Sequence, residues 1–265
     1  YQIEEIHDKI VEWDMIDSVG YSVPYSDTEI RLARNTRSRN NLYSERITSF
    51  IQNTFYIQSG NSELFLNAGI RAHYWTINDQ LVLSPRAILS INPNWSRDIQ
   101  FHMAAGYYFQ PPFYKELRDP EGVLYEDIKA QKSIHYVVGS DLNFTAWERP
   151  FIFSTELYYK YMFNLVPYKI DDVDIQYLPQ YFARGYAVGI EFKINGEFVK
   201  DAESWATLSI MQTKEDIYKD YYIKADKTVV SPGYYPRPTN QLLSFGLFFQ
   251  DYFLYEEVYR LEEKT

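Results

Sequence analysis

Apolar and polar residues alternate along most of the chain, and this alternation predicts long β-strands. In residues 63–75 the even positions are apolar or aromatic, whereas Glu63, Asn67, Arg71 and His73 occupy odd positions. The same period predicts strands at 81–91, 97–109, 133–145, 151–163, 185–194 and 241–253, and less regular alternation predicts strands at 1–13, 46–58 and 204–213. We therefore expect an all-β chain of about ten strands.

The length of these segments favours strands that cross a membrane. Several run for about 12 or 13 residues, against about five or six in ordinary globular sheets. At ~3.3 Å per residue and a tilt near 40°, such a strand rises roughly 30 Å, close to the hydrocarbon thickness of a bilayer. The face that carries Tyr186, Val188 and Ile190 would then contact lipid, and the face that carries Glu191 and Lys193 would contact a water-filled lumen.

The connections between the strands alternate between short and long. Short polar connections are expected at 58–62, 92–96, 146–150 and 195–203, and long ones at about 14–45, 110–132, 164–183 and 214–240, with 77–80 as a short exception. Trp75, Trp95, Trp147 and Trp205 lie near strand ends, where aromatic residues form girdles in lipid. The pattern predicts an antiparallel transmembrane β-barrel with long extracellular loops, located in the bacterial outer membrane.

Composition excludes several other classes of protein. The formal net charge is −10 and no basic stripe is present, so we expect no nucleic-acid partner. The absence of cysteine excludes disulfide scaffolds, thiolate nucleophiles and cysteine zinc sites. The sequence also lacks a glycine-rich phosphate loop and a G-x-S-x-G motif. We therefore expect no catalytic residues, no enzyme and no cofactor.

Two proline-containing segments are the candidate ligand-binding loops. The segment FQPPFYKELRDPEG (109–122) combines aromatic and charged side chains, and PGYYPRPTN (232–240) does the same. Aromatic rings and cations on such loops would contact a ligand at the outer mouth. The alternative role of the first segment is a stiff loop that packs on its neighbours, and that of the second is to order the entry of the next strand. The candidate binding residues are Phe113, Tyr114, Lys115, Arg118, Tyr234, Tyr235 and Arg237.

Two sets of residues raise the question of a metal. His73, His102 and His135 fall on the predicted polar faces of different strands, but their spacing matches no metal motif, so scattered hydrated side chains are the favoured interpretation. Residues 169–177 carry three aspartates that could bind Ca²⁺, although the segment lacks the glycine and distal glutamate of an EF-hand, which favours a solvated acidic loop. The metal content stays open.

Several segments of this chain resemble the barrel of TonB-dependent outer-membrane receptors of Bacteroidetes-type bacteria. They include ELYYKYMFNLVPY (156–168) and ARGYAVGIEFKINGEF (183–198), and similar segments lie at 107–122, 128–144, 203–216 and 233–253. The resemblance extends over most of residues 60–253. None of these segments carries a catalytic signature.

The resemblance implies that residues 1–253 are part of a 22-stranded barrel, as a fragment or the ordered part of a longer receptor. It implies import of a small ligand such as a siderophore, cobalamin, glycan or peptide. It also implies energy from the TonB complex, acting through a plug domain that this chain does not include, and outer-membrane lipid around the barrel. A surface lipoprotein is a further candidate partner. Residues 254–265 form an acidic tail to which we assign no role.

Two alternatives remain open on the sequence. One is a self-contained outer-membrane barrel enzyme that uses Asp, Glu and His side chains at the lumen mouth, His73 among them, as acid and base. The other is a soluble β-sandwich binding domain, in which the apolar face packs against a second sheet.

Overall fold

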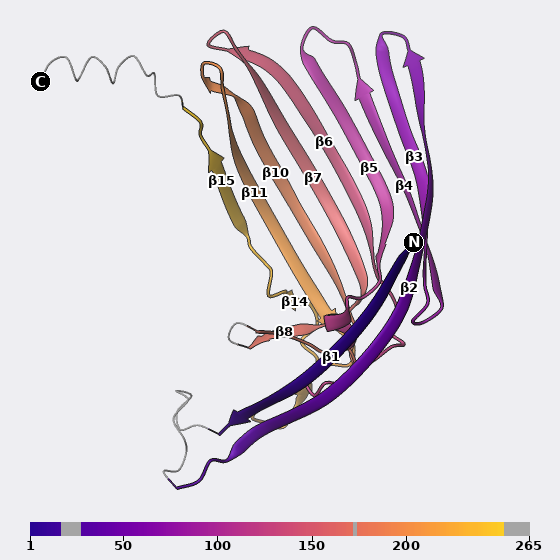
Figure 1. Ribbon diagram of the computed structural model, residues 1–265. Coiled ribbons are helices and arrows are strands. Elements are labelled where there is room, and N and C mark those ends of the chain that lie inside the picture. Colours follow the sequence, from indigo (N-terminus) through magenta and orange to yellow (C-terminus); the bar gives the residue numbers. More distant parts are fainter. Residues whose placement is uncertain (17–27, 172–173, 252–265) are drawn as a thin grey trace, which may run out of the picture.

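The computed structural model of the chain describes residues 1–16, 28–171 and 174–251. These residues form one eleven-stranded antiparallel sheet and two small two-stranded sheets, with a single 3-10 helix, η1 (Tyr114–Leu117). Figure 1 shows the long strands side by side as one curved wall, with tight turns at one end and η1, β8 and β14 at the other. No helix among the described residues has the length and apolar character needed to cross a membrane.

Each long strand pairs with the next long strand along the chain. The order in the large sheet is β1-β2-β3-β4-β5-β6-β7-β10-β11-β14, and β15 also pairs with β11. The sheet is open among the described residues, with β1 at one edge and β14 and β15 at the other. The strands are β1 (Gln2–Met15), β2 (Leu32–Ser59), β3 (Ser62–Trp75), β4 (Gln80–Asn92), β5 (Asp98–Gln110), β6 (Gln131–Ala146), β7 (Arg149–Leu165), β10 (Ala183–Val199), β11 (Ala202–Ile217), β14 (Tyr235–Pro236) and β15 (Leu243–Phe248).

The small sheets lie in the long connections. β8 (Tyr168–Asp171) pairs with β9 (Asp174–Tyr177), and β12 (Tyr222–Ile223) pairs with β13 (Val229–Val230). Long connections therefore gather at one end of the wall, as expected, while the opposite end has short turns.

All ten predicted strands are present, and the all-β antiparallel class is confirmed. One expectation about connections was wrong: the described part of the segment expected as a loop over 14–45 is mostly strand, because β2 is 28 residues long and its first half pairs with β1. This half is polar on both faces, so alternation gives no signal there, and the backbone ladder with β1 holds it extended. The last predicted strand ends at Phe248, and the tail 254–265 lies outside the described residues.

The register aligns apolar residues across neighbouring strands. One continuous row joins nine strands through directly paired positions. Its members are Phe55, Leu66, Leu89, Met103, Val138, Leu157, Ile190, Ile210 and Leu243. We call this side of the sheet the apolar face, and the rows from Ile99–Leu142–Phe153–Ile194 to Tyr107–Ile134–Tyr161–Tyr186 the apolar belt.

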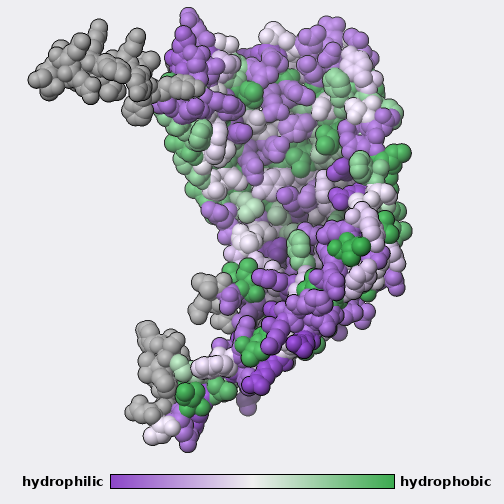
Figure 2. Space-filling view, in the orientation of Figure 1, coloured by the Kyte–Doolittle hydropathy of each residue, from purple (hydrophilic) through white to green (hydrophobic). Residues whose placement is uncertain are grey.

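No second layer covers the apolar belt among the described residues. Leu157 is 55% exposed, Val138 is 52% exposed and Leu243 is 60% exposed. Side chains in a packed protein core are almost completely buried. Figure 2 shows hydrophobic residues along the edge formed by β11 and β15, and mostly hydrophilic residues over β1 and β2.

The opposite side, the polar face, carries the ionisable residues that the alternation predicts to share one face. Cross-strand pairing places them in register: His102 is opposite Gly139, Gly139 is opposite Glu156, and Glu156 is opposite Glu191. The prediction that these side chains share a face opposite Leu66, Phe101, Val138 and Ile190 is therefore confirmed by the strand register.

The buried core lies on the polar face, at the end of the wall with the long connections. Its centre is Trp75, which is 1% exposed, and its other buried members are Leu42, Leu117, Ile128 and Val166. The place of Trp75 near a strand end predicted that it belongs to an exposed aromatic girdle. This prediction was wrong, because the side chain is buried. It occupies an odd position of β3, on the polar face, and the connection between β5 and β6 covers it.

Candidate functional site

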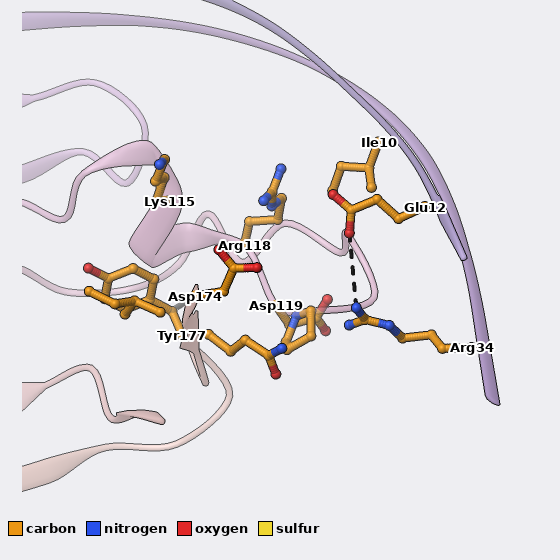
Figure 3. A pocket seen from close by; sticks show the side chains of 11 residues that line it. Ile10, Glu12, Arg34, Lys115, Arg118, Asp119, Asp174 and Tyr177 are labelled. Atoms are coloured by element: carbon orange, nitrogen blue, oxygen red, sulfur yellow. Dashed lines mark ion pairs between the residues drawn. The ribbon is translucent and has the colours of Figure 1, made fainter. Parts of the chain in front are cut away.

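A cavity that contains two of the predicted binding residues, Lys115 and Arg118, lies between the β1–β2 hairpin and two of the long connections. Its volume is about 420 Å³, and residues from β1, β2, η1, the segment after η1 and β9 line it. Figure 3 shows Glu12 and Arg34 on the hairpin side and Arg118, Asp119 and Asp174 across the cavity. Because both signs of charge line it, we call it the mixed-charge cavity.

A cluster of charged hydrogen bonds holds the connection between β5 and β6 against β1. Tyr114 donates its hydroxyl to Asp8 Oδ2 at 2.9 Å, and Arg118 Nη1 donates to the same oxygen at 2.8 Å. Partial burial acts to raise the pKa of Asp8, but the bonds from Arg118 and Tyr114 outweigh it, so that pKa lies below its ordinary value. Burial and the Asp8 carboxylate raise the pKa of Tyr114. The loop is therefore tied to β1 by an ionised carboxylate.

A second carboxylate closes the loop on itself. Asp119 is 6% exposed and accepts hydrogen bonds from the Val123 backbone N–H at 2.8 Å and from the Tyr125 hydroxyl at 3.2 Å. On the hairpin side, Arg34 pairs with Asp14 at 2.9 Å and approaches Glu12 at 4.0 Å. The cavity wall is thus largely neutralised by internal pairs, and suits a polar ligand with both signs of charge better than a strongly charged one.

The first group of predicted binding residues divides between two positions. Lys115 and Arg118 line the mixed-charge cavity, and Tyr114 supports it through Asp8. Phe113 points elsewhere: it is 60% exposed and lines a separate, smaller cleft with Arg46, Arg71 and Arg86.

The second group of predicted binding residues does not line the mixed-charge cavity. The Tyr234 ring lies 5.5 Å from the Tyr186 ring, and the Arg184 guanidinium lies 5.6 Å from the Tyr234 ring. Arg237 Nε lies 3.0 Å from Glu215 Oε2, a carboxylate whose side chain is 3% exposed. Burial, together with the nearby Glu215, raises the pKa of Tyr235 to about 12. These contacts hold the segment onto β10 and β11.

The histidines are dispersed rather than gathered. His102 lies between two carboxylates, with Nε2 3.1 Å from Glu156 Oε1 and Nδ1 3.5 Å from Asp141 Oδ2. His73 Nδ1 instead contacts Thr48 Oγ1 at 2.9 Å. Within the described ranges, no group of three or more His, Asp or Glu side chains could hold a metal ion.

Two of the three aspartates considered for Ca²⁺, Asp171 and Asp174, lie opposite each other on β8 and β9. Asp172 lies outside the described residues, and Asp174 lines the mixed-charge cavity.

The sequence does not single out Glu12 and Arg34, which line the cavity, or Asp8, which supports it by binding Arg118. Asp8 and Glu12 come from β1 and Arg34 from the part of β2 that was expected as a loop. The sequence around these residues shows only polar stretches, which do not indicate a site. The partner of Asp8 lies 110 residues away, so sequence proximity does not indicate it either.

Comparisons with known proteins leave the site to be judged on its own geometry. No protein-family model matches the chain, and no curated protein or solved structure shows significant similarity to it.

Proposed function

We propose that this chain forms part of the wall of a β-barrel in the bacterial outer membrane that imports a small ligand, in the manner of TonB-dependent receptors. The observation that carries the proposal is the row of nine apolar side chains on nine adjacent strands, none of them buried, six of them exposed by 42–60%, and without a covering layer among the described residues. An apolar surface of this kind would promote aggregation of the protein in water, whereas its contact with lipid tails is favourable.

The dimensions of the apolar belt support a lipid contact. From Ile134 to Leu142 the belt spans eight residues of β6, roughly 27 Å along the strand at ~3.4 Å per residue. A strand tilt of about 40° leaves ~20 Å along the membrane normal, close to the apolar band of ~25 Å that outer-membrane barrels present. The last row of the belt includes Tyr107, Tyr161 and Tyr186, rings suited to the headgroup region.

The polar face supports a hydrated lumen. His102, Asp141 and Glu156 lie at mid-strand positions on this face, where a dry core would impose a large desolvation penalty. A wide aqueous interior accepts such charges. The opening of the proposed pore would be the end with the long connections, where the mixed-charge cavity lies, and energy would come from the TonB complex through a plug domain.

The test uses two adjacent valines that lie on opposite faces. Val138 belongs to the apolar belt and Val137 pairs with Ala104 and Tyr158 on the polar face. Because the chain has no cysteine, Val138→Cys and Val137→Cys each provide a single site for a nitroxide spin label. The labelled proteins are reconstituted into phosphatidylcholine vesicles, and collision with oxygen is compared with collision with a water-soluble nickel chelate.

We expect the label at residue 138 to favour oxygen, which concentrates in lipid, and the label at residue 137 to favour the nickel chelate. Equal access of both labels to the nickel chelate, in protein that does not float with the vesicles, would reject the membrane assignment. A label at residue 138 that neither reagent reaches would instead indicate a second protein layer, as in a soluble sandwich.

A further inference from the structure

Three arginines surround a cleft on the polar face that is separate from the mixed-charge cavity. The cleft has a volume of about 200 Å³, and its lining includes Arg46, Arg71, Arg86, His73, Tyr108 and Phe113. No aspartate or glutamate lines it. We call it the arginine cleft.

The cleft exists because β4 and β5 separate. Their ladder runs only from the pair Ile91–Phe101 to the pair Arg86–Gly106. The next residue of β4 is Pro85, which keeps its place opposite Ile70 of β3 but has no N–H to donate toward β5. Beyond this point β4 stays with β3 and β5 stays with β6, so the wall opens at the position where the arginines lie.

Gly106 adds to the opening. A Cβ at this position would lie 2.9 Å from the Arg86 Cβ, closer than two such atoms approach. Only glycine therefore lets the stem of Arg86 lie beside β5 at the base of the cleft.

Two of the guanidinium groups have no acidic partner among the described residues. Arg86 Nη2 donates only to the neutral Gln52 Oε1 at 3.2 Å, and Arg71 has no hydrogen bond or ion pair in the described part of the chain. Arg46 is partly neutralised, because its Nη2 lies 3.2 Å from Glu4 Oε2. The cleft therefore keeps an excess of positive charge in a chain whose net charge is −10.

The cleft also contains buried polar atoms without a partner. Arg46 Nε and His73 Nε2 are both buried and make no hydrogen bond among the described residues. When Thr48 donates to His73 Nδ1, the hydrogen of the neutral ring lies on Nε2, which makes this atom a donor. An unsatisfied buried donor destabilises the fold, and an anion in the cleft would accept its hydrogen bond.

We propose that the arginine cleft binds an oxyanion, a carboxylate or a phosphate, as the head group of the imported solute. The planar fork of a guanidinium matches the oxygens of both groups, and two forks without a carboxylate partner, together with further N–H donors, suit such an anion. The volume accepts one head group rather than a whole ligand of drug size. Phe113, exposed at the rim, offers a ring against which the rest of the solute can pack.

The identity of the head group as part of an imported solute rests on the proposed function, whereas anion binding itself does not. The test therefore measures binding to the full chain in detergent, without a membrane. The probes are benzoate, inorganic phosphate and benzamide, a neutral amide of nearly the same shape as benzoate, each titrated by calorimetry at low salt. Benzoate and phosphate distinguish the two kinds of oxyanion.

We expect saturable binding of at least one anion, no binding of benzamide, and weakening of at least tenfold in Arg71→Gln/Arg86→Gln. Arg71→Lys/Arg86→Lys keeps the charge but loses the fork, so its affinity should lie between the two. The control is Arg97→Gln, the same change at an exposed residue near the opposite end of β5, which should bind like the unmodified chain. Removing like charges from one face should not prevent folding.

Unchanged anion affinity in Arg71→Gln/Arg86→Gln, or equal binding of benzamide and benzoate, would overturn the assignment. If the chain binds the anion but fails the spin-label test, the import proposal is rejected and anion binding in the arginine cleft is retained. If the chain inserts in vesicles but binds neither anion, only the proposal of anion binding in the arginine cleft is rejected.

Discussion

Arg118 Nη1 lies 2.8 Å from Asp8 Oδ2, and this ion pair joins the connection between β5 and β6 to the edge strand β1. Both side chains are largely buried, with 26% and 20% of their surfaces exposed. The loop that covers the core around Trp75 is therefore attached to the first strand of the sheet by a charged hydrogen bond.

Asp8→Asn should loosen this loop. The change removes the charge that receives both Arg118 and Tyr114, and hydrogen bonds to charged groups contribute about 1–3 kcal/mol. We expect a decrease of that size in the free energy of unfolding and faster proteolytic cleavage within residues 111–130. The control, Asp14→Asn, removes a carboxylate that pairs with Arg34 but is 57% exposed, and should change the free energy by at most ~1 kcal/mol. Equal effects of the two changes would contradict the role of Asp8.

The contribution of Asp8 should disappear in acid. Its folded-state pKa lies below the ordinary value of 3.8, so the ionised carboxylate stabilises the fold above that value and loses its effect as pH falls through the folded pKa. The difference in free energy of unfolding between the unmodified chain and Asp8→Asn should be full at pH 7 and shrink below about pH 4. Urea titrations at several pH values measure it, and a difference that grows in acid would contradict the assignment.

The two faces of each strand could be predicted from the sequence because side chains alternate with a period of two. That period places Leu66 and Val138 on one face and His102 and Glu156 on the other, whatever the strands pack against. The first half of β2 could not be predicted, because residues around Arg34 are polar on both sides and only pairing with β1 makes them a strand. Alternation fixes faces but does not name partners.

The candidate sites were less predictable for the same reason. The sequence singled out Lys115 and Arg118, but not Asp8, which lies 110 residues from Arg118. It also could not show that Arg71 and Arg86 meet, since that depends on how β3 and β4 pair and on where Pro85 ends the next ladder. Composition marks residues that suit a ligand, and strand pairing decides which of them come together.

A lysine on the apolar belt should distinguish lipid from water. Ile210 is 42% exposed and belongs to the nine-strand row, so Ile210→Lys should cost about 2–4 kcal/mol in a bilayer, whereas replacing a half-exposed residue in water changes stability little. Its neighbour Ser209 lies opposite Glu191 on the polar face, so Ser209→Lys should be neutral or stabilising. Folding titrations in phosphatidylcholine vesicles measure both changes. A neutral Ile210→Lys would argue against contact with lipid.

Gly139 keeps space for His102. A Cβ at residue 139 would overlap the His102 ring and lie 2.8 Å from the Thr155 carbonyl oxygen. Gly139→Ala should displace the imidazole from Glu156 and destabilise the fold by about 1–3 kcal/mol. In a double-mutant cycle with His102→Ala, which removes the ring, the cost of Gly139→Ala should fall by more than 0.5 kcal/mol. Strict additivity would show that the ring is not the obstacle.

Arg237 stabilises a buried carboxylate at the loop end of β11, beyond the last row of the apolar belt. Glu215 is 2% exposed, and its burial raises the pKa of its carboxyl while the attraction of Arg237 opposes that rise. Arg237→Gln leaves the charge buried without its cation, so the free energy of unfolding at pH 7 should fall by about 3–5 kcal/mol.

The pH dependence of this loss follows from the direction of the shift. A carboxyl whose folded pKa is raised favours the folded state when protonated, and this advantage is lost as pH rises through the folded pKa. Without Arg237 that pKa rises further, so the deficit of Arg237→Gln should shrink as pH is lowered from 7 toward the ordinary value of 4.5. The matched control, Glu215→Gln/Arg237→Gln, carries no buried charge and should recover much of the stability at pH 7 with little dependence on pH. A deficit that persists unchanged at pH 4.5 would show that Arg237 acts by packing, through contacts such as the one at 3.9 Å to Met162 Sδ, rather than by pairing with Glu215.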